Sequence, residues 1–361
     1  MGSVFGRNLK ISLFGESHGK GIGVIIDGFP AGVSVKMDHI TREMNRRKPG
    51  GSLATTRKEA DEVEILSGIF NGYTTGAPIG AIIRNTDLSS SDYTQYYDIP
   101  RPSHSDYPAS VKYRNHHDIR GGGHFSARIT APLVFAGALC QEYLAEKGIS
   151  VAAHLYAIKD ILDDGLSAMA EEGYAFLKDK SFPVINDAAG EAMQAVICTA
   201  KERGDSVGGM IECGIYGFPP GVGDPFFDSL ESTISHMIFS VPAVKGIEFG
   251  DGFRMVNAFG SENNDCYIQN NGKISTATNH AGGICGGIST GMPIVFRAVL
   301  KPTASIYLPQ HTINVKTMQD TTLQIQGRHD PCVAVRGVPV IEAAAAIAAT
   351  EALLSCGDVG L

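Results

Sequence analysis

The sequence predicts one globular unit that mixes helices and strands, of the α/β or α+β class. Short apolar runs bounded by glycine alternate with stretches of helical periodicity along all 361 residues. Hydrophobic residues make up 43% of the chain, which is enough for a large core. No Ser/Pro-rich stretch, charge run or fixed-period repeat divides it. We therefore expect a single domain over residues 1–361, although the length alone favours two or three.

The individual elements follow from the spacing of apolar residues. Met37, Ile40 and Met44 share one face of a predicted helix, whereas Arg42 and Arg46 lie on another face. Similar reasoning applies along the chain. We expect strands at 10–14, 23–26, 63–66, 79–84, 151–155, 207–215, 244–249 and 293–300, and helices at 37–47, 126–147, 227–239 and 340–354.

Three segments are less regular. Residues 85–118 are polar and contain three prolines, which predicts a loop with at most a short helix. Between residues 152 and 203 we expect two amphipathic helices. Residues 259–277 are polar and carry few apolar side chains, which predicts a mobile loop.

Composition argues against several classes of protein. The seven cysteines are scattered and form no C-x-x-C pair, so we expect no zinc or other metal site, no disulfide framework and a cytoplasmic location. A net charge of −8 disfavours nucleic-acid binding. No apolar stretch approaches the ~20 residues of a membrane helix. Residues 1–12 show no export signal, so we expect neither a membrane nor a secreted protein.

Glycine accounts for 43 residues and gathers in clusters, which indicates backbone that closely approaches another group. Gly15-Glu16-Ser17-His18-Gly19 places His18 at a strand end, although a tight turn with a surface histidine fits equally well. In the segment 120–128, three glycines precede a helix, so that backbone N–H groups and the Ser126 hydroxyl can face an anion. A second glycine-rich loop, 279–287, suits the approach of a flat ring or a phosphate.

Basic and titratable residues gather near these loops. Arg42, Arg46, Arg47 and Lys48, followed by Arg57 and Lys58, form the densest basic stretch. A solvated helix face is the simpler interpretation of that stretch. The glycines that follow it favour an anion pocket, because arginine grips phosphate and carboxylate with two parallel hydrogen bonds.

Three more loops carry candidate chemistry. The prolines of 100–104 stiffen a loop that holds His104, an acid or base candidate, with a structural turn as the alternative. The segment 301–305 offers one cation and two hydroxyls. Arg328 and Asp330 can act as an anion clamp and a base, and Asp330 should be extended and exposed because Pro331 follows it. Together the loops predict a site for a phosphorylated small molecule without naming a reaction.

Taken in order, these segments resemble the chorismate synthase family over almost the whole chain. Three regions carry the resemblance: GESHGKGIGVIIDGFP at 15–30, GGGHFSARITAP at 121–132 and RHDPCVAVRGVPVIEA at 328–343. NRRKPG at 45–50, RPSHSDY at 101–107, NHAGGICGG at 279–287 and KPTAS at 301–305 agree in order and spacing. The resemblance implies a β-α-β sandwich, with helices enclosed by antiparallel sheets, and a homotetramer.

The resemblance also implies a reaction. Family members convert 5-enolpyruvylshikimate 3-phosphate to chorismate and phosphate by an anti-1,4-elimination, and they require reduced FMN although no net redox change occurs. The substrate carries a phosphate and two carboxylates, which suits the arginines. Some members reduce their FMN with NADPH. This chain shows no additional reductase domain, so we expect an external flavin reductant.

By motif matching, three residues correspond to catalytic positions. His18 resembles the acid that protonates the departing phosphate, His104 the histidine beside the flavin, and Asp330 the carboxylate that takes up a proton near flavin N5. The arginines at substrate positions are Arg46, Arg47, Arg128 and Arg328. The flavin positions are His124, Phe125, Ser126, Pro242, Ala243, Gly286, Lys301, Pro302, Thr303, Ala304, Ser305 and Arg328.

The chain departs from the family pattern at a few positions. Many members have Arg-Ser where this chain has His124-Phe125, and a frequent arginine aligns with Leu53, with Arg57 as its candidate replacement. Pro242 stands where other members have Asn. These departures leave a second hypothesis, a protein that binds flavin or a phosphorylated metabolite without catalysing the elimination.

Overall fold

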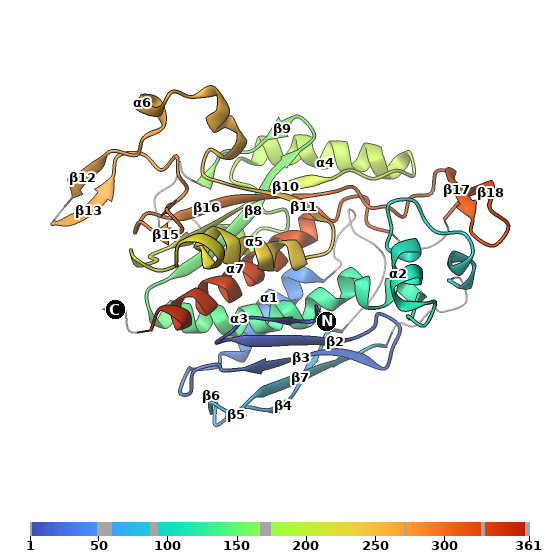
Figure 1. Ribbon diagram of the computed structural model, residues 1–361, viewed down its shortest axis with the longest axis horizontal. Coiled ribbons are helices and arrows are strands. Elements are labelled where there is room, and N and C mark those ends of the chain that lie inside the picture. Colours follow the sequence, from blue (N-terminus) through green and yellow to red (C-terminus); the bar gives the residue numbers. More distant parts are fainter. Residues whose placement is uncertain are drawn as a thin grey trace.

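The computed structural model describes residues 2–48, 60–86, 93–166, 175–270, 272–325 and 329–357. A central layer of helices lies between two five-stranded sheets (Figure 1), and every strand pair in both sheets is antiparallel. Helix α4 (Asp187–Glu202) covers the outer side of one sheet. The predicted α+β sandwich is therefore confirmed.

The first sheet forms one outer layer of the sandwich. Its strand order is β1-β2-β3-β7-β4. Along β3, Ile22, Val24 and Ile26 are buried while Ile25 is half exposed, which is the alternation of a sheet with one covered face. The bounds are β1 (Val4–Phe5), β2 (Lys10–Gly15), β3 (Gly21–Asp27), β4 (Val63–Ser67) and β7 (Ile79–Arg84).

The second sheet is covered on both faces, so its strands are more continuously apolar. Its strand order is β11-β16-β10-β8-β9. The start of β11 lies opposite the end of β16, which brings Ala243 beside Lys301, whose N–H donates to the Ala243 carbonyl at 2.9 Å. The bounds are β8 (Ser150–Ile158), β9 (Ile161–Leu162), β10 (Gly209–Tyr216), β11 (Val244–Phe249) and β16 (Ile294–Leu300).

Four helices fill the middle layer: α1 (Met37–Arg47), α3 (Thr130–Glu146), α5 (Leu230–Ser240) and α7 (Ala334–Cys356). Helix α7 is rich in alanine, and its length and apolar composition would allow it to cross a membrane. However, 94% of its most apolar 18-residue stretch is buried inside the protein. It is therefore the core helix. It packs closely on α3, because a Cβ on Gly137 would lie only 2.3 Å from the Cβ of Ala343.

Smaller elements decorate the ends of the sandwich (Figure 1). Helix α2 (Asp106–Tyr113) follows the loop that holds His104. Short 3₁₀ turns precede α2 and α3. The remaining elements are α6 (Gly260–Asn263) and the hairpins β5 (Ile69–Phe70) with β6 (Tyr73–Thr74), β12 (Tyr267–Asn270) with β13 (Lys273–Thr276), β14 (Ile284–Cys285) with β15 (Ile288–Ser289), and β17 (Gln310–Asn314) with β18 (Gln319–Leu323).

Several expected elements need correction. Residues 259–277 hold α6 and the β12–β13 hairpin rather than only a loop. These elements project away from the sandwich (Figure 1) and therefore lack the apolar periodicity that marks a core-facing strand. Between 152 and 203 the described residues contain one α-helix, α4, and a 3₁₀ turn, Ala175–Asp179. Helix α5 begins at Leu230, because the Ser229 hydroxyl caps the N–H of Ser232 at 3.1 Å.

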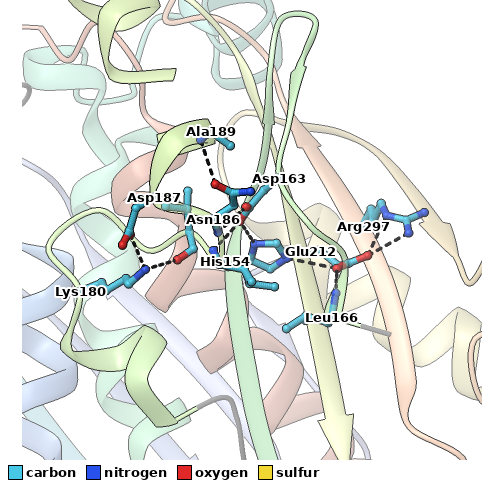
Figure 2. A network of polar contacts seen from close by, with 11 residues as sticks. His154, Asp163, Leu166, Lys180, Asn186, Asp187, Ala189, Glu212 and Arg297 are labelled. Atoms are coloured by element: carbon cyan, nitrogen blue, oxygen red, sulfur yellow. Dashed lines mark hydrogen bonds and ion pairs between the residues drawn. The ribbon is translucent and has the colours of Figure 1, made fainter. Parts of the chain in front are cut away.

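A row of buried charges crosses the second sheet. His154 on β8, Glu212 on β10, Arg297 on β16 and Glu248 on β11 are cross-strand neighbours in register. Figure 2 shows the His154 ring between the carboxylates of Glu212 and Asp163, at 3.1 and 2.9 Å, with Arg297 on the other side of Glu212. Because each charge lies between opposite charges, the row can be buried without an isolated ion.

These carboxylates also hold irregular backbone against the sheet. Glu212 accepts the N–H of Leu166 at 2.5 Å, and Asp163 accepts the N–H groups of Ile185 and Asn186. Burial alone would lower the pKa of His154, but its hydrogen bonds with Asp163 and Glu212 raise the pKa above the ordinary value. The histidine therefore holds its proton to higher pH than an ordinary imidazole does.

We predict that His154→Gln lowers the free energy of unfolding by about 3–5 kcal/mol near pH 6, because it leaves the buried Asp163 without its cation and Glu212 with Arg297 alone. The raised pKa means that this stabilisation is complete below about pH 6.5 and is lost as the pH rises through the folded-state pKa. Denaturant unfolding at several pH values from 6 to 9 measures this effect. The difference in the free energy of unfolding between wild type and His154→Gln should become smaller as the pH rises. His311→Gln, at an exposed histidine on β17, is the control. A gap that does not change with pH would contradict a charged His154.

Candidate functional site

A cavity of about 830 Å³ opens where the edge of the first sheet meets the ends of α3, α5 and α7. Segments far apart in the chain form its wall, including β1, the loop before α2, the glycine run before α3 and the loop after β16. Four arginines and three lysines line it, whereas Asp330 is the one carboxylate among the described lining residues. The cavity thus presents excess positive charge in a protein with a net charge of −8.

Two of the predicted arginines share one buried carboxylate. Arg47 ends α1 and donates through Nη2 to Asp61 Oδ2 at 2.5 Å, while Arg128 Nη1 contacts Asp61 Oδ1. All three side chains are at most 3% exposed. Burial alone would raise the pKa of Asp61, but Arg47 and Arg128 hold this pKa below its usual range. Asp61 therefore stays ionised and fixes both guanidinium groups in the cavity wall.

Asp330 forms a second ion pair on this side of the cavity. Its Oδ2 lies 2.6 Å from Nη1 of Arg336 in the first turn of α7, and Arg336 Nε donates to the Arg47 carbonyl at 3.0 Å. The Asp330 carbonyl also accepts the Thr303 hydroxyl at 2.8 Å. Asp330 is only 13% exposed, so the expectation that it is exposed was wrong: its ion pair holds it against the cavity wall.

His104 lies on the wall beside a second buried carboxylate. Its Nδ1 is 2.6 Å from Asp106 Oδ1, and Arg101 holds both oxygens of Asp106 at 2.7 Å. Burial lowers the pKa of His104, and the positive charges of Arg101 and Lys301 lower it further; together they outweigh the opposing effect of Asp106. His104 is therefore neutral at pH 7.

His18 lies in the turn between β2 and β3 and is only 6% exposed, so the interpretation as a surface histidine was wrong. Its ring packs behind Gly121, where a Cβ would lie 2.2 Å from Nδ1, and the φ of 59° at Gly121 also favours glycine. The Ser17 hydroxyl beside it is fully buried and has no hydrogen-bond partner among the described residues. A polar atom in such a position is commonly satisfied by a ligand or water.

Two further segments of the cavity wall carry most of the predicted flavin positions. Pro242, Ala243 and the segment Lys301–Ser305 line the cavity together, and Lys301 Nζ donates to the Ser103 carbonyl at 3.0 Å. Burial lowers the pKa of Lys301, and the charge of Lys245 lowers it further. Phe5, Leu13 and Met237 add apolar surface to the same cavity.

The three residues after the glycine run also line the cavity, each in a different way. His124 contacts the Gly15 carbonyl through Nδ1 at 2.8 Å and the Ser3 hydroxyl through Nε2 at 3.2 Å. Phe125 is 41% exposed and lies against Tyr113, with ring centroids 6.2 Å apart. Ser126 accepts the N–H of Arg128 at 3.3 Å, so its hydroxyl caps the turn before α3.

Two predicted residues lie elsewhere. The Arg46 side chain points away from the cavity and pairs with Glu43 at 2.5 Å and with Glu342 of α7, because consecutive residues of a helix face different sides. Gly286 forms the turn of the β14–β15 hairpin and does not line the cavity. Arg328, Leu53, Arg57 and Lys58 lie outside the described residues.

Sequence reasoning missed the residues that hold the predicted ones. Asp106 follows His104 by two positions and Arg336 follows Asp330 by six, so both stood in segments already selected. Asp61 stood in no selected motif, and it lies 14 positions after Arg47 and 67 before Arg128, so nothing in the local sequence linked it to either arginine. The described residues contain no group of three or more His, Cys, Asp or Glu side chains that could hold a metal ion.

A β-α-β sandwich with a cationic cavity, two histidines and an aspartate defines an enzyme that acts on a small anionic molecule. The profile of the family described as chorismate synthase matches residues 9–354. The chain therefore belongs to the chorismate synthase family of enzymes.

Individual relatives agree with this assignment. The chorismate synthase of Thermococcus kodakarensis is 43% identical over 349 residues, covering 97% of each chain. That of Chitinophaga pinensis is 45% identical over 350 residues, covering 97% of this chain and 96% of its own. A solved structure titled "Crystal Structure of Chorismate Synthase" superposes with a TM-score of 0.77 at 28% identity, covering 98% of this chain and 93% of that one.

We predict that Asp61→Asn lowers the free energy of unfolding at pH 7 by about 3–5 kcal/mol, because it leaves two buried guanidinium groups without their shared anion. Glu62→Gln changes the exposed neighbouring carboxylate and should leave the stability unchanged. Denaturant unfolding of both variants measures the difference. Equal stability of the two would show that Asp61 does not hold Arg47 and Arg128.

Proposed function

We propose that this protein eliminates phosphate from 5-enolpyruvylshikimate 3-phosphate to form chorismate, and that it requires reduced FMN. One observation carries the proposal: residues from four segments that match the family motifs converge on one cationic cavity. Arg47, Arg128, His104 and Asp330 line it, and His18 lies directly behind Gly121 of the same wall. Relatives that cover 97% of the chain bear the name of this activity.

The cavity fits a flavin mononucleotide together with a small substrate. Its volume of about 830 Å³ lies in the upper part of the range of roughly 300–1,000 Å³ that is usual for ligand sites. Phe5, Leu13 and Met237 offer apolar surface for a flat ring, and Lys301 with Ser305 offers a cation and a hydroxyl for a phosphate. When bound, reduced FMN supplies reversible donation of electron density to the substrate.

The residues of the chain bind the substrate and move protons. Arg47, Arg128 and Arg336 attract the phosphate and carboxylates, because their charges outnumber those of Asp61 and Asp330. His18 is the acid that protonates the departing phosphate. His104, neutral at pH 7, offers Nε2 as a proton acceptor on the cavity wall, and Asp330 is the carboxylate that takes up a proton near the flavin, as the family resemblance implies.

The assembly and the supply of electrons are part of the same proposal. We propose a homotetramer, as the family resemblance implies, in the cytoplasm, where the seven cysteines stay reduced. An external reductant supplies the electrons for FMN. The substrate is a small molecule with one phosphate and two carboxylates, and we propose no nucleic-acid or membrane partner.

The test is an anaerobic assay of the purified protein with reduced FMN and 5-enolpyruvylshikimate 3-phosphate. We expect chorismate absorbance and stoichiometric phosphate release, with neither in the control that lacks flavin. Tight FMN binding without turnover would instead support the second hypothesis, a binding protein whose His124-Phe125 departure has removed the activity. Absence of both FMN binding and turnover would contradict both hypotheses.

We predict that His104→Ala lowers kcat by ~10²–10⁴, the range typical of a general acid or base. His116→Ala is the matched control, because His116 is exposed and lies outside the cavity wall. The measurement is steady-state kinetics under the same anaerobic conditions, with FMN binding followed separately. A His104→Ala enzyme with the wild-type rate would remove this residue from the mechanism.

A further inference from the structure

We propose that Asp106 is a positioning residue that holds His104 in the tautomer with its proton on Nδ1, so that Nε2 is open to the cavity as a proton acceptor. The geometry of three neighbouring side chains carries this inference. Its consequence for turnover rests on the proposed function, whereas the assignment of the tautomer does not.

The contacts of His104 distinguish its two ring nitrogens. Nδ1 lies 2.6 Å from Asp106 Oδ1, a length typical of a charge-assisted hydrogen bond. Nε2 has no hydrogen-bond partner among the described residues and lies on the side of Gly122, where a Cβ would be 3.7 Å away. Arg101 Nη2 also lies 3.1 Å from Nδ1, but it already donates to Asp106 Oδ1 at 2.7 Å. An ionised carboxylate can only accept, and a lone pair on Nδ1 would face Oδ1 at 2.6 Å, so the short contact places the proton on Nδ1.

Arg101 keeps Asp106 ionised and in place. It donates through Nε to Oδ2 and through Nη2 to Oδ1, both at 2.7 Å, and its backbone N–H donates to Oδ2 at 3.0 Å. The Arg101 guanidinium in turn lies 4.4 Å from the centre of the Tyr96 ring. Asp106 is 2% exposed, and Arg101 donates to both of its carboxylate oxygens, which fixes the orientation of the carboxylate.

The charges around His104 set its titration. Asp106 is the anion that contacts it, while Arg101 from the same loop and Lys301 from the loop after β16 are the cations that face it. Burial, aided by the two cations, lowers the pKa of His104 and keeps the ring neutral at rest, so Nε2 carries a lone pair. Protonation of Nε2 leaves the imidazolium hydrogen-bonded to Asp106, which stays ionised.

Asp106→Asn separates positioning from packing, because the side chain keeps its size. The Oδ2 position accepts two hydrogen bonds from Arg101 and therefore selects the amide oxygen. The amide nitrogen must then face His104 Nδ1, and this nitrogen is a donor. The variant therefore favours the other tautomer, with the proton on Nε2 and no acceptor toward the cavity.

The first measurement is ¹⁵N NMR of histidine-labelled protein without flavin or substrate, with the His104 signals assigned by His104→Gln. We expect an Nδ1–H tautomer in the wild type and an Nε2–H tautomer in Asp106→Asn. Asp98→Asn, which removes a nearby exposed carboxylate paired with Lys316, should retain the wild-type signals. An Nε2–H tautomer in the wild type, or identical tautomers in the wild type and Asp106→Asn, overturns the proposal.

The second measurement is the pH dependence of kcat. We expect Asp106→Asn to lower kcat by ~10² or more at unchanged FMN affinity, and to shift the acidic limb to lower pH because His104 loses its anion. Asp106→Glu, which restores a carboxylate, should recover part of the rate. Wild-type kcat and profile in Asp106→Asn overturn the positioning role. An inactive wild type counts against the proposed function, and the NMR result then decides the role of Asp106 alone.

Discussion

Burial of guanidinium groups is the constraint on which the site depends. A charged side chain can leave water only if an opposite charge meets it with good geometry. Arg47 and Arg128 meet this condition through Asp61, Arg336 through Asp330, and Arg101 through Asp106. Asp61 and Asp330 come from loops and Asp106 from the first turn of α2, so these ion pairs hold the segments around the cavity in place.

This arrangement also explains how a cavity that attracts anions is stable before any anion binds. The carboxylates neutralise part of the positive charge, and Lys245 and Lys301 leave an excess of positive charge in the cavity lining. An incoming substrate therefore meets groups that are already oriented, and little reorganisation is needed when it binds. The row of His154, Glu212 and Arg297 also pairs buried charges with opposite charges, but there the pairing stabilises the fold and does not form a binding site.

Arg46 and Arg47 show where reasoning from local sequence ends. They are consecutive on α1, and both were expected to bind substrate, yet Arg46 pairs with Glu342 inside the helical layer while Arg47 reaches the cavity. The angle of about 100° between consecutive helical residues guarantees that they face different sides, but the partner on each side comes from another part of the chain. Gly286 is a second example. It forms the turn of the β14–β15 hairpin and does not line the cavity, although its motif resembles a flavin loop.

By itself, the sequence determined a mixture of helices and strands, most strands of both sheets, the helices at 37–47 and 340–354, and the loops that carry His18, His104 and Asp330; the α+β sandwich came from the family resemblance. It could do so because apolar periodicity and glycine or proline at turns are local signals. The protruding β12–β13 hairpin escaped prediction because it faces no core. Only the tertiary structure decided that Asp61 joins Arg47 to Arg128, because electrostatic pairing across 14 and 67 residues depends on where the fold places each segment and leaves no periodic mark in the sequence.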